Sequence, residues 1–443
     1  MILLNSVTLP WWSAAPFILL LALIVIAPIL LSNYWHHYYK QISVVLGLSV
    51  VAYFGFSLHD FHTPIETGVE YLSFVIFLGA LFVAAGGIYI HADFKVTPKL
   101  NVLFLLMGAI VSNIIGTTGA AMLLVRPFIR LNKYKIAPYH LVFFIFIVCN
   151  VGGALTPIGD PPLFLGYLKG VPFGFTFSHL IGYWTLAIGL LLAIFYGLDK
   201  KNKLSDEVDD IPSTNKIVIY GKRNILWLVV IIGAVFLDPN FYDWLPYIQL
   251  GENKISFVRE TMQLSAAVAC YFSANKTAIN GNDFSFEPIL EVVFLFFGLF
   301  FTMMPALKLV AAFAITPEGQ EVFTTSSMYW ASGFFSSFLD NAPTYLNFLT
   351  AAMAKFGKDI NAPAEVIAFA SGENMAYLIS ISLGSVFFGA MTYIGNGPNL
   401  MVKSIADHLG VKMPDFISYI TKYALVYLLP VLLVVFIAMK LVA

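Results

Sequence analysis

Charged residues are scarce in this chain, since Asp, Glu, Lys and Arg make up only 11% of its 443 residues. Soluble domains carry about 25% charged residues, so this scarcity excludes a soluble globular protein. Cysteine is almost absent, and the two that occur, Cys149 and Cys270, both sit in apolar segments. This pattern excludes a disulfide framework and a thiolate metal site. The chain also lacks a basic tract, and we expect no nucleic-acid partner.

Long apolar runs take the place of charge. Hydrophobic residues make up 59% of the sequence and aromatic residues 16%. The runs recur at roughly the 20 residues that a helix needs to cross the hydrocarbon of a bilayer. They predict an all-α polytopic membrane protein, in contact with lipid, with about ten spans. We expect these spans near 16–32, 42–58, 71–91, 138–168, 179–198, 224–238, 255–273, 287–312, 375–404 and 417–441.

Two further apolar stretches are interrupted mid-way by small and polar residues. They are Leu103–Phe128, broken at Ser112–Gly119, and Ser326–Ala352, broken at Ser336–Thr344. We predict that both are re-entrant hairpins. Basic residues flank the first hairpin on both sides and place its ends in the cytoplasm, because Lys and Arg concentrate there. Acidic residues before the second hairpin favour the outer side, and the same count predicts external chain ends.

Two ten-residue segments are versions of one peptide. Gly153–Pro162 reads GALTPIGDPP, and Gly389–Pro398 reads GAMTYIGNGP. A helix in lipid carries such breaks only where protein or an ion satisfies the freed backbone groups. Paired breaks in two halves of a chain are typical of secondary transporters. We therefore predict four parts: N-terminal helices at 1–63, inverted repeat 1 at 64–200, a cytoplasmic linker with two connecting helices at 201–284, and inverted repeat 2 at 285–443. Repeat 1 contains hairpin 103–128 and broken helix 138–168. Repeat 2 contains hairpin 326–352 and broken helix 375–404.

The hairpin tips and helix breaks contain the candidate binding residues. An ionised carboxylate at membrane depth costs about 3 kcal/mol, so we expect Asp160 and Asp340 to bind a cation or a proton in turn. Neighbouring hydroxyl, amide and carbonyl oxygens suit a small hard cation such as sodium. We predict a sodium site at Asp340, Asn341, Asp160 and Thr156. The full set of candidate ion or substrate ligands is Asp340, Asn341, Asp160, Thr156, Thr392, Asn396, Asn113, Thr117, Thr118, Thr344 and Ser337.

A structural role for the same residues stays open at this point. Asp is a favoured N-cap, so each aspartate can also serve only to cap a half-helix. Hydroxyl and amide side chains also satisfy broken backbone in membrane helices. This second interpretation applies to Thr156, Thr392, Asn396 and Asn399.

The segments Ser336–Pro343 (SSFLDNAP) and Gly152–Asp160 (GGALTPIGD) resemble those of NhaD-type sodium/proton antiporters. That group is similar to arsenite permeases and citrate-type carriers of the ion-transporter superfamily, and the resemblance spans nearly the whole chain. It implies inverted repeats, a homodimer, a bacterial inner membrane, and no cofactor besides transported sodium or lithium ions and protons. Residues Pro161–Phe164 stand where those antiporters are expected to be Thr-rich, which indicates a sister branch, some of whose members are described as citrate transporters.

The predicted function is the exchange of sodium or lithium for protons, without enzymatic activity. Sodium- or proton-coupled transport of a citrate- or dicarboxylate-like anion is the first alternative, because Ser112-Asn113 and Thr117-Thr118 approach the tips of anion carriers. Against it, Asp340 repels a carboxylate in a medium of low dielectric constant, and no arginine sits at a tip. Transport of arsenite or another oxyanion is a lesser alternative.

An intramembrane aspartyl protease is an alternative from a different class. Such an enzyme needs two facing carboxylates that share a proton. Pro157–Asp160 and Pro305–Leu307 approach the motifs of these proteases. The first glycine of the motif is absent, however, and no partner aspartate precedes it. Proteolysis also leaves the repeated peptides unexplained.

Overall fold

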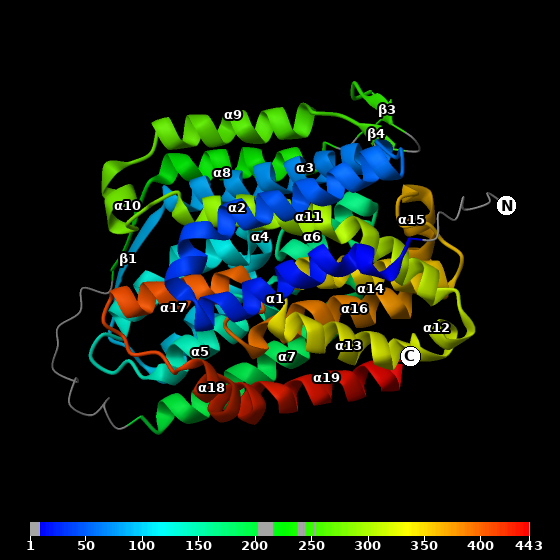
Figure 1. The fold of residues 1–443 in the computed structure, drawn as a ribbon. Coiled ribbons are helices and arrows are strands. Elements are labelled where there is room, and N and C mark those ends of the chain that lie inside the picture. The colour runs from blue at the N-terminus through cyan, green and yellow to red at the C-terminus, as the bar shows by residue number, and fades with distance from the viewer. Residues whose placement is uncertain are drawn as a thin grey trace.

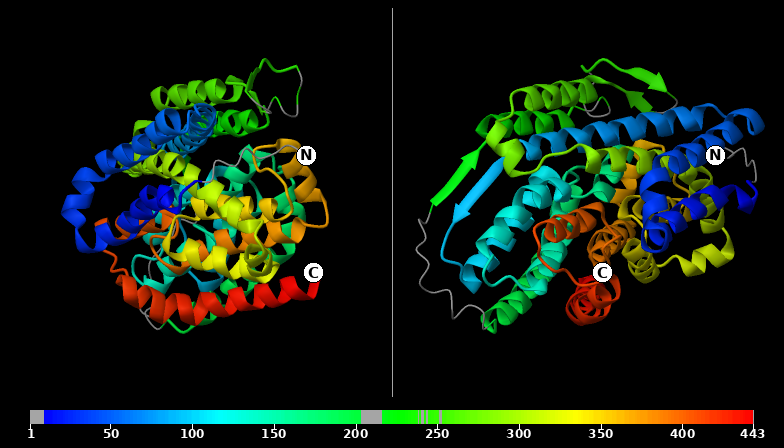
Figure 2. Two further views of the ribbon diagram at one scale, coloured as in Figure 1. Left: turned by 45° about the vertical axis from the view of Figure 1, so that its right-hand side comes forward. Right: turned by 60° about the vertical axis from the view of Figure 1, so that its left-hand side comes forward.

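The structure is a computed structural model that describes residues 9–202, 216–237, 239, 242, 244–250 and 253–442. Helices lie side by side through most of it (Figure 1, Figure 2). Within these residues, eight helices are long and apolar enough to cross a membrane, or nine if the pair Pro363–Ser371 and Met375–Met391, bent by 94°, is one span. The predicted all-α polytopic membrane protein is confirmed. The part of the predicted linker at 203–215 lies outside the described residues.

The first half of the chain consists of helices joined by short connections. Several begin with proline in the first turn, where its missing N–H is not needed. In chain order the elements are a 3-10 turn η1 (Trp11–Ala14), α1 (Ala15–Leu30), α2 (Ser32–Ala52), a π-helical turn η2 (Tyr53–Ser57), α3 (His62–Gly86), β1 (Tyr89–Asp93), α4 (Pro98–Leu131), α5 (Pro138–Ile147), a 3-10 turn η3 (Val151–Leu155), α6 (Pro161–Lys169) and α7 (Phe175–Lys200).

The second half continues the bundle. Its elements are β2 (Lys216–Tyr220), α8 (Lys222–Val235), β3 (Ile248–Leu250), β4 (Asn253–Ile255), α9 (Val258–Phe272), α10 (Lys276–Gly281), α11 (Glu287–Ala314), α12 (Pro317–Val322), α13 (Thr325–Phe338), α14 (Asn341–Lys355), α15 (Pro363–Ser371), α16 (Met375–Phe388), a 3-10 turn η5 (Gly389–Met391), α17 (Gly397–His408), α18 (Phe416–Tyr419), a π-helical segment η6 (Ile420–Leu428) and α19 (Leu429–Val442).

The count of long apolar helices differs from the ten predicted spans mainly at 224–238 and 255–273. The corresponding helices, α8 and α9, have 14 and 15 residues. At 1.5 Å per residue they are about 21–23 Å long, which is less than the roughly 30 Å of bilayer hydrocarbon. They lie together along one side of the bundle, against α3 (Figure 1). Their apolar sequences are long enough to pack on a neighbour but short for a span.

Helix α4 folds back on itself at Gly116, whose φ of 77° is the left-handed conformation that glycine adopts without strain. The limbs on either side run antiparallel. Near the open end the Asn101 amide donates to the side chain of Asn132 at 2.9 Å, and the rings of Phe104 and Phe128 stack at 5.2 Å. These contacts make residues 98–131 a helical hairpin, hereafter hairpin 1, with Gly116 at its tip.

Helices α13 and α14 form a second hairpin, hereafter hairpin 2. Its turn is Leu339, which is extended, and Asp340, which is the N-cap of α14. The ring centroids of Phe335 and Phe348 lie 6.1 Å apart across the two limbs. The turns of both hairpins fall inside the polar interruptions that the sequence showed.

Helices α3 and α11 pack against each other in the core. The hydroxyl of Tyr71 donates to the carbonyl of Val293 at 2.8 Å, and the rings of Phe74 and Phe296 are 4.8 Å apart. The antiparallel ribbon of β1 and β2 lies at one end of the bundle. The start of α1 and the end of α19 both lie at the opposite end (Figure 1).

Candidate functional site

The two interrupted helices, α5–α6 and α16–α17, follow the same backbone path through their breaks. Each passes through a 3-10 turn into an extended threonine, Thr156 (φ −137°, ψ 154°) or Thr392 (φ −139°, ψ 170°). Each then enters its second helix from an extended polar residue, Asp160 (φ −141°, ψ 142°) or Asn396 (φ −152°, ψ 139°). The similar peptides thus encode similar local structures.

Glycine is required inside each break because the backbone crosses itself closely. A Cβ at Gly159 would lie 2.0 Å from the carbonyl oxygen of Gly153, and one at Gly395 would lie 2.6 Å from that of Gly389. Real Cβ atoms do not approach other atoms so closely. The two glycine pairs therefore permit the same loop in both halves of the chain.

Each threonine fixes its break to the adjacent hairpin. The hydroxyl of Thr156 donates to the backbone carbonyl of Asn113 at 2.6 Å, and that of Thr392 donates to the carbonyl of Ser337 at 2.5 Å. The Thr156 oxygen also accepts from the Gly159 N–H at 3.1 Å. Both hydroxyl groups thereby satisfy backbone carbonyls next to the turns of the hairpins.

Two serines add a second bond of the same kind, from hairpin to helix. Ser112 donates to the carbonyl of Val148 at 2.7 Å, and Ser336 donates to the carbonyl of Ser385 at 2.5 Å. Ser336 lies 224 residues after Ser112, as Ser337 does after Asn113. Each hairpin is therefore joined to its own broken helix by an equivalent pair of hydroxyl–carbonyl bonds.

The four interruptions meet at the carboxylate of Asp160, which is 1% exposed. One oxygen, Oδ1, accepts from the hydroxyl of Thr117 at 2.8 Å and from the amide of Asn396 at 3.0 Å. The other, Oδ2, accepts from the amide of Asn341 at 2.6 Å. Asn396 is the counterpart of Asp160, and Asn341 is the counterpart of Thr117. Two pairs of equivalent residues thus surround one point.

The surroundings explain why the acid stands at position 160 and the amide at position 396. Three donors point at Asp160, so an acceptor-only carboxylate fits there. The amide of Asn396 also donates to the backbone carbonyl of Cys149 at 3.1 Å and to Oδ1 of Asn150 at 3.2 Å. Those oxygens need a donor, which an ionised aspartate cannot supply.

Asn150 is a site residue that the sequence analysis did not select. It is fully buried, and its amide donates to the carbonyl of Ile145 at 2.9 Å and to Oδ1 of Asn399 at 2.8 Å. The Asn399 amide in turn donates to the carbonyls of Gly389 at 2.8 Å and Thr392 at 2.9 Å. Asn150 therefore joins the two broken helices. The only feature of the sequence that could have pointed to Asn150 is that it is a single amide at the end of an apolar run.

The comparison with protein families bears on what this site does. A family described as "Putative citrate transport" matches residues 6–440, which is nearly the whole chain. The chain belongs to this family. No curated protein matches the chain. Membership in this family makes the protein a membrane transporter. It supports the relationship to ion transporters that the sequence indicated. It does not support the NhaD-type branch in particular.

In this citrate-transport family member, the two aspartates have different roles in the structure. Asp340 is half-buried and caps α14 by accepting from the N–H of Ala342 at 3.0 Å, whereas Asp160 makes no such cap. The two carboxylates share no hydrogen bond among the described residues; the neighbour of Asp340, Asn341, reaches Asp160 instead. An aspartyl protease needs the carboxylates to face each other.

The remaining predicted ligands lie around the centre without a direct bond to Asp160. Thr344 donates to the carbonyl of Asp340 at 2.9 Å, and Ser337 donates to that of Gly333 at 2.9 Å. Thr118 is half-buried in hairpin 1. Of the four residues predicted to bind sodium, the structure joins Asp160 to Asn341, while the Thr156 hydroxyl is bonded to backbone and Asp340 caps its helix.

Proposed function

We propose that this protein is a cation-coupled secondary transporter of a citrate-like organic anion, with Asp160 as the binding site of the coupling sodium ion or proton. The observation that carries the proposal is the match of residues 6–440 to the citrate-transport family. In the same proposal, the protein lies in a bacterial inner membrane with external chain ends and acts as a homodimer.

The surroundings of Asp160 support cation coupling. Its three hydrogen-bond donors are neutral, and it forms no ion pair among the described residues. A buried carboxylate without a cationic partner is costly, and binding of a proton or sodium removes that cost. The Oδ1 of Asn341 is buried without a hydrogen-bond partner in the described structure, which offers a further oxygen ligand beside Asp160. Oxygen ligands of this kind suit a hard cation.

The same charge argument predicts the order of binding. An anionic substrate near the tips is repelled by an ionised Asp160 in a medium of low dielectric constant. Once the cation has bound, this repulsion is removed. We therefore expect the anion to bind after the cation, so that neither crosses alone.

Sodium/proton exchange is the second candidate. It is favoured by the absence of a basic side chain bonded to Asp160 among the described residues, since a carrier of a multivalent anion commonly offers a cationic group. In that case Asp160 would bind sodium and protons alternately without an organic substrate.

Reconstituted vesicles separate the two candidates. Labelled citrate uptake is measured with an imposed sodium or proton gradient, and an internal pH dye reports sodium-driven proton movement without citrate. Cation-driven citrate uptake that is lost in Asp160→Asn supports the first candidate. Sodium-driven pH change without citrate uptake supports the second. If neither flux depends on Asp160, both assignments of this site are rejected.

A further inference from the structure

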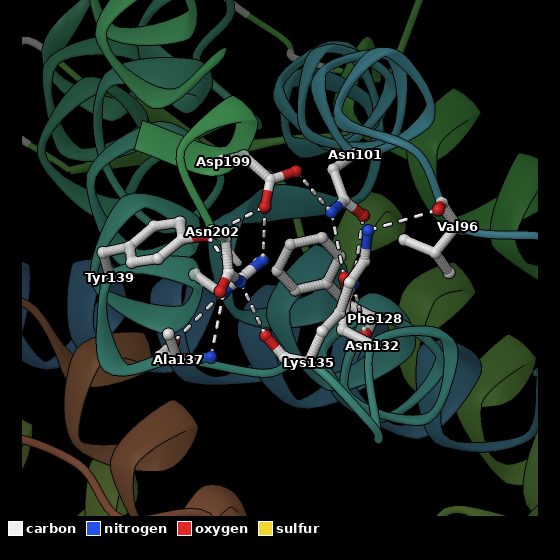
Figure 3. Close-up of polar contacts among 10 residues, drawn as sticks. Val96, Asn101, Phe128, Asn132, Lys135, Ala137, Tyr139, Asp199 and Asn202 are labelled. Carbon is white, nitrogen blue, oxygen red and sulfur yellow. Dashed lines mark hydrogen bonds and ion pairs between the residues drawn. The ribbon is translucent and has the colours of Figure 1, made fainter. Parts of the chain in front are cut away.

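A second buried polar cluster lies at the open end of hairpin 1, and Figure 3 shows its polar contacts. Its centre is Asp199, near the end of α7, which is 2% exposed. Asp199 Oδ1 accepts from the hydroxyl of Tyr139 at 2.8 Å and contacts Nε2 of His140 at 3.0 Å. Asp199 Oδ2 accepts from the amide of Asn101 at 2.9 Å. One carboxylate thus joins α7 to the start of α5 and to hairpin 1.

The same cluster closes the open end of hairpin 1. The side-chain amides of Asn101 and Asn132 donate to each other at 2.9 and 3.0 Å, so the carboxylate that binds Asn101 holds both limbs. Asn202, just after α7, donates to the carbonyl of Lys135 at 2.9 Å and to the hydroxyl of Tyr139 at 3.1 Å (Figure 3). The open end of hairpin 1 is therefore joined to α7 and to the start of α5 through this cluster, in addition to the bonds that hold its tip to the first broken helix.

His140 has polar neighbours at both of its ring nitrogens. Its side chain is completely buried. Nδ1 lies 3.0 Å from the N–H of Ala137, which donates to a neutral imidazole, and 3.2 Å from the carbonyl of Ala137, which accepts from an imidazolium. Nε2 lies 3.0 Å from Oδ1 of Asp199, which is an ion-pair distance once the ring is charged. Histidine is the side chain that changes charge near neutral pH.

We propose that His140 and Asp199 form a pH-sensitive latch that holds the open end of hairpin 1 tightly when the histidine is protonated and more loosely when it is neutral. Protonation turns this close contact with a buried carboxylate into an ion pair. It also cancels the single negative charge of the cluster. Hairpin 1 is thus expected to loosen as the pH rises on its side of the membrane.

The other groups next to the pair are aromatic rings and one lysine. From α5, the Tyr139 ring stacks on the imidazole at 4.2 Å, and from α4 the neutral Phe128 ring lies at 6.1 Å. The ring of Phe195 on α7 lies at 5.7 Å. In the turn before α5, Lys135 directs its Nζ to the carbonyl of Val96 at 3.2 Å (Figure 3).

Two further elements pack against α5. On α17, Lys403 and Asp407 pair with each other at 2.7 Å, and His408 is exposed in its last turn. On η6, Tyr427 packs on Phe143, one turn beyond the histidine. Among these groups of the described residues, His140 is the only histidine within ion-pair distance of a carboxylate.

Amide hydrogen exchange of the wild-type protein in detergent, without substrate, tests the latch independently of the transported ion. Between about pH 6 and pH 8, after correction for the intrinsic rate, protection of residues 98–131 is expected to fall about five- to tenfold. Hairpin 2 is the internal control, because its open end is held by Lys355, whose ammonium donates to the carbonyls of Gln320 and Phe323. Equal pH responses of the two hairpins overturn the proposal.

Two variants assign the response to the histidine. His140→Gln can still donate to Asp199 but cannot gain a charge, so the pH response of hairpin 1 is expected to vanish. Tyr139→Phe removes one donor to the same carboxylate and is expected to lower protection at every pH while keeping the response. A His140→Gln protein with the full response contradicts the latch. If that variant does not fold, the rate of hydrogen exchange at the imidazole C2 of wild-type His140 is measured by mass spectrometry as a function of pH. A rate that shows no titration step between pH 5 and 9 also rejects the latch.

Discussion

At the scale of single residues, hydrogen-bond chemistry separates the two equivalent positions at the centre. Position 160 faces three donors, from Thr117, Asn341 and Asn396, whereas position 396 faces the acceptors of Cys149 and Asn150. The halves of the chain are alike in backbone and opposite in polarity at this point. A single carboxylate, and so a single titratable charge, results from a pair of equivalent positions.

Asp160→Asn is expected to abolish cation coupling while leaving the fold in place. The amide keeps the shape and one acceptor, but its NH₂ group faces a donor, so we expect a loss of about 1–3 kcal/mol in stability. Transport driven by the coupling cation should fall by more than about tenfold, because an affinity loss of about 1.4 kcal/mol already has that effect. Vesicle flux and thermal unfolding measure the two effects. Unchanged cation dependence would contradict the assignment of Asp160.

Asn396→Asp is expected to be more damaging than Asp160→Asn. The new carboxylate meets the carbonyl of Cys149, Oδ1 of Asn150 and Asp160 itself, and an uncompensated buried charge costs about 3–5 kcal/mol. Adding Asp160→Asn in the same chain removes one of these repulsions and leaves the two carbonyl contacts. Thermal unfolding is therefore expected to rank the double variant between the wild type and Asn396→Asp. A double variant with wild-type stability and transport would show that the local donors and acceptors do not determine where the acid stands.

At the scale of elements, the breaks are positioned by glycine and by hydroxyl groups that reach neighbouring backbone. Each hairpin is held to its broken helix by a serine and a threonine, and the bonds in the two halves correspond one to one. The elements that carry the site are thus fixed to each other by backbone contacts, which leaves the side chains of Asp160, Asn341 and Asn396 free to define the centre.

Gly159→Ala is expected to disrupt the first break. The added methyl would lie 2.0 Å from the Gly153 carbonyl, so the loop must shift, and we expect destabilisation of about 3 kcal/mol or more. Gly189→Ala in α7 is the matched control, since a Cβ there meets nothing within 4 Å. That change is expected to be neutral or to stabilise by up to about 1 kcal/mol, because alanine favours a helix. Equal thermal unfolding of the two variants would refute the crossing geometry.

At the scale of the whole molecule, contacts between distant segments fasten the helices that flank the site. Asp60, before α3, accepts from the ammonium of Lys308 on α11 at 3.1 Å and from the hydroxyl of Thr63 at 2.7 Å. Burial raises the pKa of Asp60, but the hydrogen bonds from Thr63 and the bond and charge of Lys308 outweigh burial and hold the pKa below its ordinary value. Asp60 therefore stabilises the folded protein in its ionised form.

The contribution of Asp60 is expected to depend on pH with a definite sign. Because its pKa is lowered in the folded state, the stabilisation is present above the ordinary carboxyl pKa of about 3.9 and is lost as the pH falls through the folded-state value. Asp60→Asn should be less stable than the wild type by up to about 1 kcal/mol at pH 7, as for a partly exposed ion pair. The difference in melting temperature should shrink below about pH 4. A difference that grows on acidification would contradict a lowered pKa of Asp60 in the folded protein.

Local chemistry explains which parts of the molecule were predictable. The apolar runs, the hairpin turns near Gly116 and Asp340, and the breaks at Thr156 and Thr392 depend on residues close in the chain. Two of the ten expected spans, α8 and α9, are short, and the eight or nine long apolar helices of the described residues include α4, which folds back as hairpin 1. The different surroundings of Asp160 and Asp340 could not be predicted, because the hydrogen-bond partners of Asp160 come from distant segments. The contact of His140 with Asp199 could not be predicted for the same reason.

The amino-acid sequence by itself determined a helical membrane protein with two matching interruptions, because hydrophobicity, glycine and proline act on the backbone where they stand. Only the tertiary structure decided that Asp160 lies at the centre while Asp340 caps a helix. The donors around Asp160 come from residues 181 and 236 positions away as well as from its own half. The cluster at Asp199 likewise joins residues 60 and 98 positions apart. Such contacts depend on how the helices pack, which no single segment encodes.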